Sequence, residues 1–238
     1  MTKWTEFWQN YRLINVKSDD DLLYQVGLTV NGKPISKEVF QIIVNDGINN
    51  LELNDNDDLL DLCCGNGLIT FELAKHVRTA IGADVSVPFI ANAKQFKSSA
   101  NINYMVCDVT KINEIKEFDK KRINKVFMYG ALAYFNYQEV DKLLSNIFKI
   151  TKEDCRVFIG NVLDKERLWN FYNTPRRKLD YIVRQQILRK DPAVGKWWNK
   201  KELRELTKKN GFSIDFKMED PRLHTSHYRY DCILKKDK

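Results

Sequence analysis

Two glycines, Gly65 and Gly67, stand between an apolar run and helix-forming sequence in the segment LLDLCCGNGLIT, residues 59–70. Glycine lets the backbone approach a ligand where any Cβ would collide. A helix that begins near Leu68 also points its unpaired N–H groups into the same space. This pattern predicts a site for a nucleotide-like ligand. The alternative is that the two glycines only close a strand-to-helix turn.

Acidic residues end the next two apolar runs. Asp84 ends the strand-like segment TAIGADVS (79–86), and Asp108 ends INYMVCDVT (102–110). An acid about twenty residues after a glycine turn is placed to accept hydrogen bonds from ribose hydroxyls. Either acid alone could be a solvated loop residue, but independent turns have no reason to align acids at successive strand ends. The pattern therefore predicts the ligand crevice of an open, parallel α/β sheet.

The spacing of the glycines also distinguishes between cofactors. A dinucleotide-binding turn has the pattern GxGxxG, whereas Thr70 occupies the third glycine position here and Asp61 lies four residues before Gly65. The string D-x-x-x-G-x-G resembles the first motif of class I S-adenosylmethionine (SAM)-dependent methyltransferases, closely over residues 55–160 and loosely over the remainder. The resemblance implies SAM as cofactor and S-adenosylhomocysteine (SAH) as product, with Asp84 on the ribose and Asp108 on the adenine. The cofactor-binding residues that we predict are Asp61, Cys63, Gly65, Gly67, Asp84, Val85, Cys107, Asp108, Val109, Tyr129, Tyr134, Tyr11 and Gln25.

The segment KVFMYGALAYF (125–135) predicts a buried central strand that ends in a small-residue turn at 129–131. In the family that the chain resembles, the end of this fourth strand faces the transferring methyl group. Methyltransferases acting on amino groups of adenine or cytosine carry an Asn/Asp-Pro-Pro-aromatic turn here, and enzymes methylating carbon 5 of pyrimidines need a nucleophilic cysteine after this strand. The segment has neither feature, which disfavours both chemistries.

Methyl transfer to an oxygen, or less favourably a nitrogen, requires the loss of one proton, and positioning is expected to supply much of the rate enhancement. Histidine titrates near neutrality, so we predict a base in the loop before the last strand. The predicted catalytic residues are His224, His227 and Tyr228. The predicted acceptor-binding residues are Arg176, Arg177, Arg222 and Tyr230, since arginine offers a forked set of donors to an anion.

The net charge of +7 is confined to the last third of the chain. Residues 1–163 hold 19 Lys and Arg against 21 Asp and Glu, and residues 164–238 hold 20 against 11. This favours an anionic acceptor, unless the basic residues form only a solvated surface. The aromatic lead-in, the LCCGNG turn and the YRYD ending resemble small-molecule methyltransferases of bacterial surface-polysaccharide pathways, which implies a glycan or sugar-nucleotide-type precursor as acceptor. Two alternatives stay open: a transfer or ribosomal RNA methyltransferase, and a cofactor-binding partner subunit without catalysis.

The elements that must position these residues follow in chain order. Residues 1–50 predict an N-terminal helical cap, and residues 51–238 a Rossmann-like methyltransferase domain with helices on both faces of a seven-stranded mixed sheet. The predicted strand order is 3-2-1-4-5-7-6, with the last strand antiparallel. A basic, aromatic insertion at about 164–196 predicts a helical lid over the carboxyl edge of the sheet.

Composition bounds the remaining expectations. The five cysteines give no CxxC pair, so we expect neither a metal site nor a disulfide. We expect the protein to reside in a reducing cytoplasm. The N-terminus mixes charged and aromatic residues, and no apolar run approaches about eighteen residues, so neither a signal peptide nor a membrane span is expected. The oligomeric state is not predicted.

Overall fold

A computed structural model describes residues 3–116, 122–187 and 194–237, apart from the side chains of Lys3 and Gln186. Its centre is a seven-stranded sheet in the order β5-β4-β3-β6-β7-β9-β8. The strands are β3 (Asp58–Leu62), β4 (Thr79–Asp84), β5 (Ile102–Val106), β6 (Ile123–Tyr129), β7 (Thr151–Leu163), β8 (Phe212–Met218) and β9 (Arg229–Lys236). The pairs β7–β9 and β8–β9 are antiparallel and all other pairs are parallel. The predicted strand order and the antiparallel last strand are therefore confirmed.

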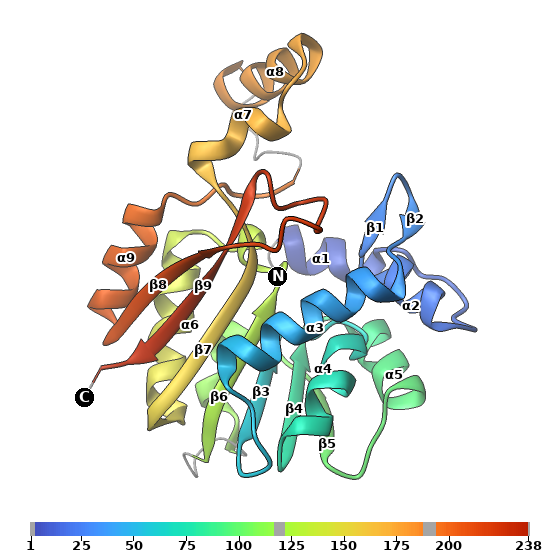
Figure 1. Cartoon of the computed structure of the whole chain (residues 1–238), viewed down its shortest axis with the longest axis vertical. Helices are drawn as coiled ribbons and strands as arrows, with labels where there is room; N and C mark the ends of the chain where they lie inside the picture. The colour runs from blue at the N-terminus through green and yellow to red at the C-terminus, as the bar shows by residue number, and fades with distance from the viewer. Residues whose placement is uncertain (1–2, 117–121, 188–193, 238) are drawn as a thin grey trace.

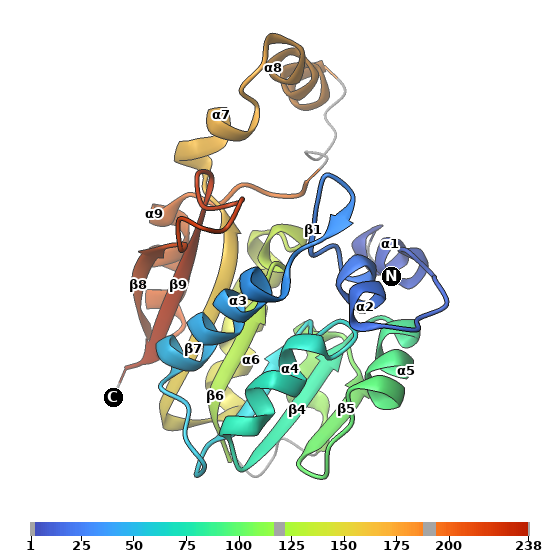
Figure 2. The same ribbon diagram turned by 45° about the vertical axis from the view of Figure 1, so that its right-hand side comes forward.

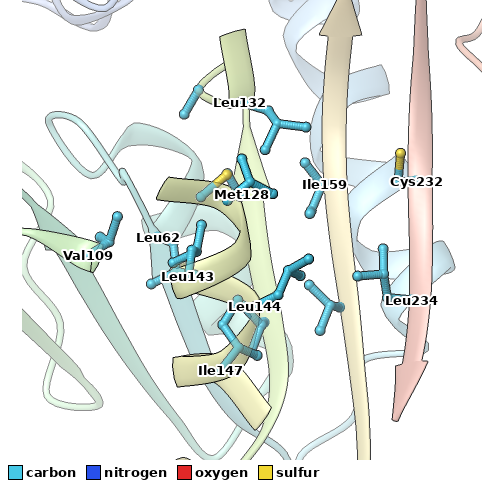
Figure 3. Close-up of a cluster of buried hydrophobic side chains, with 14 of the residues drawn as sticks. Leu62, Val109, Met128, Leu132, Leu143, Leu144, Ile147, Ile159, Cys232 and Leu234 are labelled. Carbon is cyan, nitrogen blue, oxygen red and sulfur yellow. The ribbon is translucent and has the colours of Figure 1, made fainter. Parts of the chain in front are cut away.

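Helices cover both faces of this sheet (Figure 1). One face carries α3 (Lys37–Leu51), α4 (Leu68–Leu73) with the short helix η1 (Ala74–His76), and α5 (Val87–Phe96). The other face carries α6 (Tyr137–Ile150) and α9 (Lys200–Lys209). The amphipathic helix α6 packs Leu143, Leu144 and Ile147 onto residues of β6, β7 and β9 (Figure 3). Alternation along the strands and the periodicity of the helices place apolar side chains on both faces of the sheet.

The N-terminal segment contributes to both the sheet packing and the site. It contains α1 (Lys3–Asn10), α2 (Asp19–Gln25), a two-stranded hairpin of β1 (Thr29–Val30) and β2 (Lys33–Pro34), and then α3. Helix α3 begins after Ser36, whose side chain accepts from the Val39 N–H. Its Gly47 lies against Phe127, where an added Cβ would sit 2.8 Å from the ring. Helix α3 is thus part of the domain core, whereas α1 and α2 lie at the carboxyl edge of the sheet (Figure 2).

The predicted fourth strand ends earlier than its apolar run. Strand β6 ends at Tyr129, and the run continues as the short helix η4 (Leu132–Tyr134). Gly130 has a φ of 68°, a left-handed conformation that ends the strand. A second short helix, η2 (Val109–Glu114), follows β5. Both turns therefore begin at the same edge of the sheet.

The segment after β7 projects from the body of the protein. It consists of η5 (Lys165–Arg167), α7 (Leu168–Phe171), α8 (Pro175–Ile182) and the π-helix η6 (Val183–Ile187). Figures 1 and 2 both show α7 and α8 standing away from the sheet. The base of this arm is an aromatic cluster in which Phe171 contacts Trp197 and Tyr228. The predicted lid at 164–196 falls on this arm and on residues 188–193, which lie outside the described residues.

Two kinds of feature are absent from the described part of the chain. Its helices include none that is long and apolar enough to cross a membrane. Its His, Cys, Asp and Glu side chains form no group of three or more that could hold a metal ion.

Candidate functional site

A cavity of about 300 Å³ lies at the carboxyl ends of β3, β4, β5 and β6. Each of these strands contributes the residues at its end or just after it, because parallel strands with crossover helices all end at one edge. Ten of the predicted cofactor residues line the cavity: Tyr11, Cys63, Gly65, Asp84, Val85, Cys107, Asp108, Val109, Tyr129 and Tyr134. Asp61, Gly67 and Gln25 do not line it. The predicted grouping of strand-end residues around one pocket is thus present in the structure.

The glycine turn is held in a conformation that requires glycine. Gly65 and Gly67 have φ values of 57° and 76°, in the left-handed region. A Cβ on Gly65 would lie 2.9 Å from Val26, and one on Gly67 would lie 2.6 Å from the Tyr104 hydroxyl oxygen. Gly67 also precedes the first residue of α4 as its N-cap. The turn therefore brings bare backbone and a helix start to the cavity wall.

Asp84 connects this turn to the end of β4. One carboxylate oxygen accepts from the Gly65 N–H at 2.9 Å, and the other accepts from the Ser86 N–H at 2.8 Å. The side chain is only 7% exposed, and burial raises the pKa of Asp84 in spite of these two N–H donors. Each oxygen keeps a further lone pair. Asp84 can thus fix the loop and still accept a hydrogen bond from a ligand hydroxyl, which is the predicted ribose contact.

Asp108 caps the short helix η2. Its Oδ1 accepts from the Thr110 N–H at 3.0 Å and from the Thr110 hydroxyl at 2.7 Å. The side chain is exposed and lines the cavity. Because Thr110 engages Oδ1, Oδ2 is the oxygen left for a ligand amine.

We expect Asp108→Asn to weaken SAH binding less than Asp108→Ala, because the amide keeps the shape and one acceptor oxygen for Thr110. Alanine removes both the ligand acceptor and the cap, and a lost cap costs about 1 kcal/mol of stability. Calorimetric titration with SAH, together with thermal unfolding of each variant, measures the two effects separately. Equal affinities for wild type and both variants would show that Asp108 does not contact the cofactor.

Asp61 lies beneath the glycine turn, outside the cavity. It is 2% exposed, and its carboxylate accepts from the Thr70 hydroxyl at 2.5 Å. Asp61 therefore ties β3 to the first turn of α4, so any influence on a cofactor passes through the turn. Burial raises the pKa of the Asp61 carboxyl to about 7.

This pKa predicts a pH-dependent contribution to stability. The carboxyl binds its proton more tightly in the folded state than in the unfolded chain, so its contribution is complete below pH 3.8 and is lost as the pH rises through about 7. Asp61→Asn keeps the acceptor for Thr70 and should remove a fall in stability on the order of a few kcal/mol between pH 5 and pH 8. Urea unfolding across this range measures the slope.

A matched control is Asp220→Asn. The pKa of Asp220 is lowered to about 2, chiefly by hydrogen bonds from Arg222, so it stays ionised over the whole range and its replacement should leave the slope unchanged. Equal slopes for wild type and Asp61→Asn would contradict the assignment to Asp61.

Gln25 supports the turn from the other side. Its Oε1 accepts from the amides of Asn66, at 3.0 Å, and Asn92, at 3.1 Å, and it is 1% exposed. Asn66 also donates to the carbonyl of Leu22 at 2.9 Å. Helix α2 is thereby fixed to the glycine turn, and Gln25 is placed to position this turn and does not line the cavity.

Aromatic side chains form one side of the cavity, here called the aromatic roof. Helix α1 contributes Trp4, Trp8 and Tyr11 to the lining, and the rings of Trp4 and Trp8 lie 4.8 and 5.0 Å from the ring of Tyr134. The helix is held to the loop after β4, where Gln9 donates to the Val85 carbonyl at 2.6 Å. The amphipathic pattern of α1 therefore packs its aromatic face onto the cavity.

The predicted catalytic residues lie beside the cavity and do not line it. His224 is exposed, and desolvation by nearby protein atoms, Arg229 and His227 lower its pKa, which favours the neutral imidazole. His227 is exposed, and Tyr228 is buried in the aromatic cluster at the base of the arm. Burial also raises the pKa of Tyr134, so the hydroxyl that does line the cavity is a poor base.

The predicted acceptor-binding residues also lie outside the cavity. Arg176 and Arg177 belong to α8 in the arm, and Arg177 donates to the Phe171 carbonyl at 3.3 Å. Arg222 is exposed and pairs with Asp220 at 2.6 Å. Tyr230 is fully buried, with its ring packed against Phe216. In this structure none of the four reaches the site.

Sequence reasoning missed Asn161 and Arg229, which both line the cavity beyond the end of β6. Arg229 Nη1 donates to the carbonyl of Asn161 at 3.0 Å and also to its side-chain Oδ1. Asn161 lies at an irregularity in the β7–β9 pairing and has a φ of 64°. The only local signal for Arg229 was its place in the alternating YRYDCIL strand, directly after the loop to which we assigned the histidines.

Comparisons with known proteins agree with this geometry. A family model described as a methyltransferase domain matches residues 59–154, which include the glycine turn, Asp84 and Asp108. The 23S rRNA (uracil(1939)-C(5))-methyltransferase RlmD of Histophilus somni (strain 129Pt) is 25% identical over 119 residues, which are 44% of this chain and 27% of that protein. The chain thus spans about a quarter of the length of this curated relative.

Solved structures of a cyclopropane synthase and of a C-methyltransferase share the fold over nearly the whole chain. The cyclopropane synthase MmaA2 of Mycobacterium tuberculosis superposes with a TM-score of 0.70 at 14% identity, over 99% of both chains. Geranyl diphosphate C-methyltransferase of Streptomyces coelicolor A3(2), crystallised with Mg²⁺, geranyl diphosphate and SAH, gives a TM-score of 0.64 at 12% identity, over 100% of this chain and 98% of that one. At this identity the likeness shows the fold alone. The predicted class I methyltransferase fold is confirmed, and the predictions of an enzyme and of SAM as its cofactor agree with the matched domain.

Proposed function

We propose that this protein is a SAM-dependent methyltransferase that transfers a methyl group to an oxygen of a small, anionic acceptor. The observation that carries the proposal is the convergence of the glycine turn, Asp84 and Asp108 from three successive strand ends on one cavity. The residues fit the cofactor: Gly65 brings backbone without a side chain to the cavity wall, Asp84 offers acceptors for ribose hydroxyls, and Asp108 offers one for an amine. When bound, SAM supplies a methyl group on a sulfonium sulfur, and transfer to the acceptor oxygen forms a C–O bond, breaks the C–S bond and leaves SAH.

The protein's own contribution is orientation, exclusion of water and removal of one proton. The roof formed by Trp4, Trp8 and Tyr134 shields the cavity from solvent, and the turn after β6 brings Gly130 to the cavity wall. Holding the reacting atoms in line supplies much of the barrier lowering in such a transfer. We assign the proton to His224, which does not line the cavity but lies near enough to Arg229 in the cavity wall for that charge to lower its pKa and favour the neutral imidazole.

The cysteines that line the cavity do not act as nucleophiles in this proposal. Desolvation raises the pKa of Cys63 and Cys64 well above the ordinary value and that of Cys107 to about 11, so all three stay protonated thiols. Residues 130–136, which follow β6, contain no cysteine. A mechanism that adds a thiolate to carbon 6 of a uracil therefore has no placed nucleophile, although RlmD matches part of this chain.

An RNA acceptor is the second candidate, because a curated relative methylates 23S rRNA and the last third of this chain is basic. The match covers 44% of the chain. Among the described residues, the cavity wall carries three acids, Asp84, Asp108 and Glu139, against one cation, which does not resemble a phosphate-tracking groove. We therefore place the small anionic acceptor first. The narrower prediction of a glycan or sugar-nucleotide precursor rests on the sequence resemblance alone.

One experiment separates these acceptors from the third reading, a cofactor-binding subunit without activity. Calorimetry with SAM and SAH first tests the cofactor site. Incubation with SAM labelled in its methyl group, together with a cell extract, then shows where the label goes. Label in acid-soluble small molecules supports the proposal, and acid-insoluble label that ribonuclease releases supports RNA. Cofactor binding with no transfer into either fraction supports the non-catalytic subunit.

A further inference from the structure

Arg229 is the only cationic residue among the described residues that line the cavity. It lies at the start of β9, beside β7 and beyond the end of β6. Asp84 and Asp108, the predicted contacts of the adenosine, follow β4 and β5 on the other side of β3. A cofactor that extends from these acids along the edge of the sheet would present its methyl group near the end of β6. Arg229 then lies on the acceptor's side.

The guanidinium is fixed in place and only partly used. Nη1 donates to Asn161 twice, whereas Nε is buried and has no hydrogen-bond partner among the described residues. A buried donor without a partner costs free energy. Because Nε is buried, a ligand in the cavity would accept from the other nitrogens of the guanidinium.

Two buried acids support this arrangement and do not pair directly with the guanidinium. Asp231 accepts from the Asn161 N–H at 2.9 Å, and Glu219 accepts from the Asn161 side-chain amide at 2.6 Å and from the Thr225 hydroxyl at 2.7 Å. Burial raises the pKa of Glu219 and raises that of Asp231 to about 7, whereas the charge of Arg229 acts in the opposite direction on Glu219. Asn161 is thereby held by Asp231, Glu219 and Arg229. The guanidinium lies 5.4 Å from the ring centre of Tyr228 and forms no ion pair within 4 Å among the described residues.

We propose that Arg229, positioned by Asn161, binds a carboxylate or phosphate group of the acceptor. The planar guanidinium matches such an oxyanion, and a charge-assisted pair in a partly closed cavity is stronger than one in water. The inference rests on the proposed function and replaces Arg176, Arg177 and Arg222 as the anion-binding residues. The same chemistry would also bind the carboxylate of the cofactor's methionine portion, so the test must distinguish these two sources.

The test uses two series of titrations of the wild type and of Arg229→Gln. In the first series, calorimetry measures the affinity for SAH and for 5′-methylthioadenosine, which lacks the amino-acid carboxylate. In the second series, inorganic phosphate and then acetate are added to the SAH-saturated protein, and NMR follows the backbone amide of Gly130. Arg222→Gln is the matched control, because it removes an arginine outside the cavity. Arg229→Lys keeps the charge, and thermal unfolding shows whether each variant folds.

We expect the oxyanions to shift the Gly130 signal and to bind at least ten-fold more weakly to Arg229→Gln, with unchanged SAH affinity. Arg222→Gln should behave as wild type, and Arg229→Lys should keep part of the oxyanion binding. A loss of SAH affinity with unchanged affinity for 5′-methylthioadenosine would overturn the assignment to the acceptor, because the site would then hold the cofactor's carboxylate. No response to either oxyanion in a wild type that binds SAH overturns the site itself. A wild type that does not bind SAH refutes the proposed function instead.

Discussion

Asp84→Ala should weaken SAH binding by about 1.5 to 3 kcal/mol, which is roughly ten- to more than a hundred-fold in the dissociation constant. The side chain has two expected roles, since it accepts from the N–H groups of Gly65 and Ser86 and we predict that it accepts from ribose hydroxyls. Its removal therefore leaves a ligand hydroxyl without an acceptor and releases the glycine turn. Calorimetric titration with SAH measures the total loss.

Two further measurements separate the ribose contact from the loop contact. A 2′-deoxy analogue of SAH lacks one of the hydroxyls, so Asp84→Ala should weaken its binding less than it weakens binding of SAH. Asp141→Ala is the control, because that carboxylate also accepts two hydrogen bonds, from Lys209 and Asn210, but lies outside the cavity. An Asp84→Ala protein that folds and binds SAH like wild type would refute the cofactor site.

Gly67→Ala should destabilise the protein by about 2 to 4 kcal/mol and weaken SAH binding at least ten-fold. A left-handed φ costs a residue with a Cβ roughly 1 to 2 kcal/mol, and overpacking adds about 1 to 3 kcal/mol. The overpacking arises because the new Cβ would lie 2.6 to 2.8 Å from Tyr104, whose hydroxyl is fixed by its bond to the Lys97 carbonyl at 2.9 Å. Thermal unfolding should show a fall in Tm of roughly 5 to 15 °C.

The chain offers a matched control at Gly32 in the β1–β2 hairpin. Gly32 has a φ of 77°, close to the 76° of Gly67, but a Cβ there would meet nothing within 4 Å. Gly32→Ala therefore measures the backbone cost alone, and the difference between the two variants measures the clash with Tyr104. Equal destabilisation would mean that Tyr104 moves aside freely, and the tight approach of β5 to the turn would then not be a constraint.

Much of the cofactor side of the site could be predicted because it depends on local features of the chain. Residues that follow parallel strands lie at the same edge of the sheet, whatever the surrounding structure. Gly65, Asp84 and Asp108 therefore lie close together once the strand order is fixed. Asp61 was harder to place from spacing alone, because one residue along a strand reverses the direction of a side chain. In the structure it accepts from Thr70 beneath the turn.

The acceptor side could not be predicted, because it is made by contacts between distant segments. Arg229 reaches the cavity only through its bonds to Asn161, 68 residues away, and through the antiparallel pairing of β7 with β9. The basic arm at α8 looked like a lid in the sequence, since its position after the fifth strand and its charge both favoured the cavity. In the structure α7 and α8 stand away from the sheet (Figure 1), and Phe171 packs against Trp197 and Tyr228 at the base of the arm. The role of the arm as a lid stays a prediction.

The sequence by itself determined the sheet order, the conformation of the glycine turn and the acids that meet beside it, because φ preferences and strand periodicity act within a few residues. The tertiary structure alone decided that Asp61 and Gln25 support the turn from outside the cavity and that Arg229 is the cation among the described residues that line it. The positions of these residues depend on contacts between segments that are far apart in the sequence, and no local sequence pattern specifies such contacts.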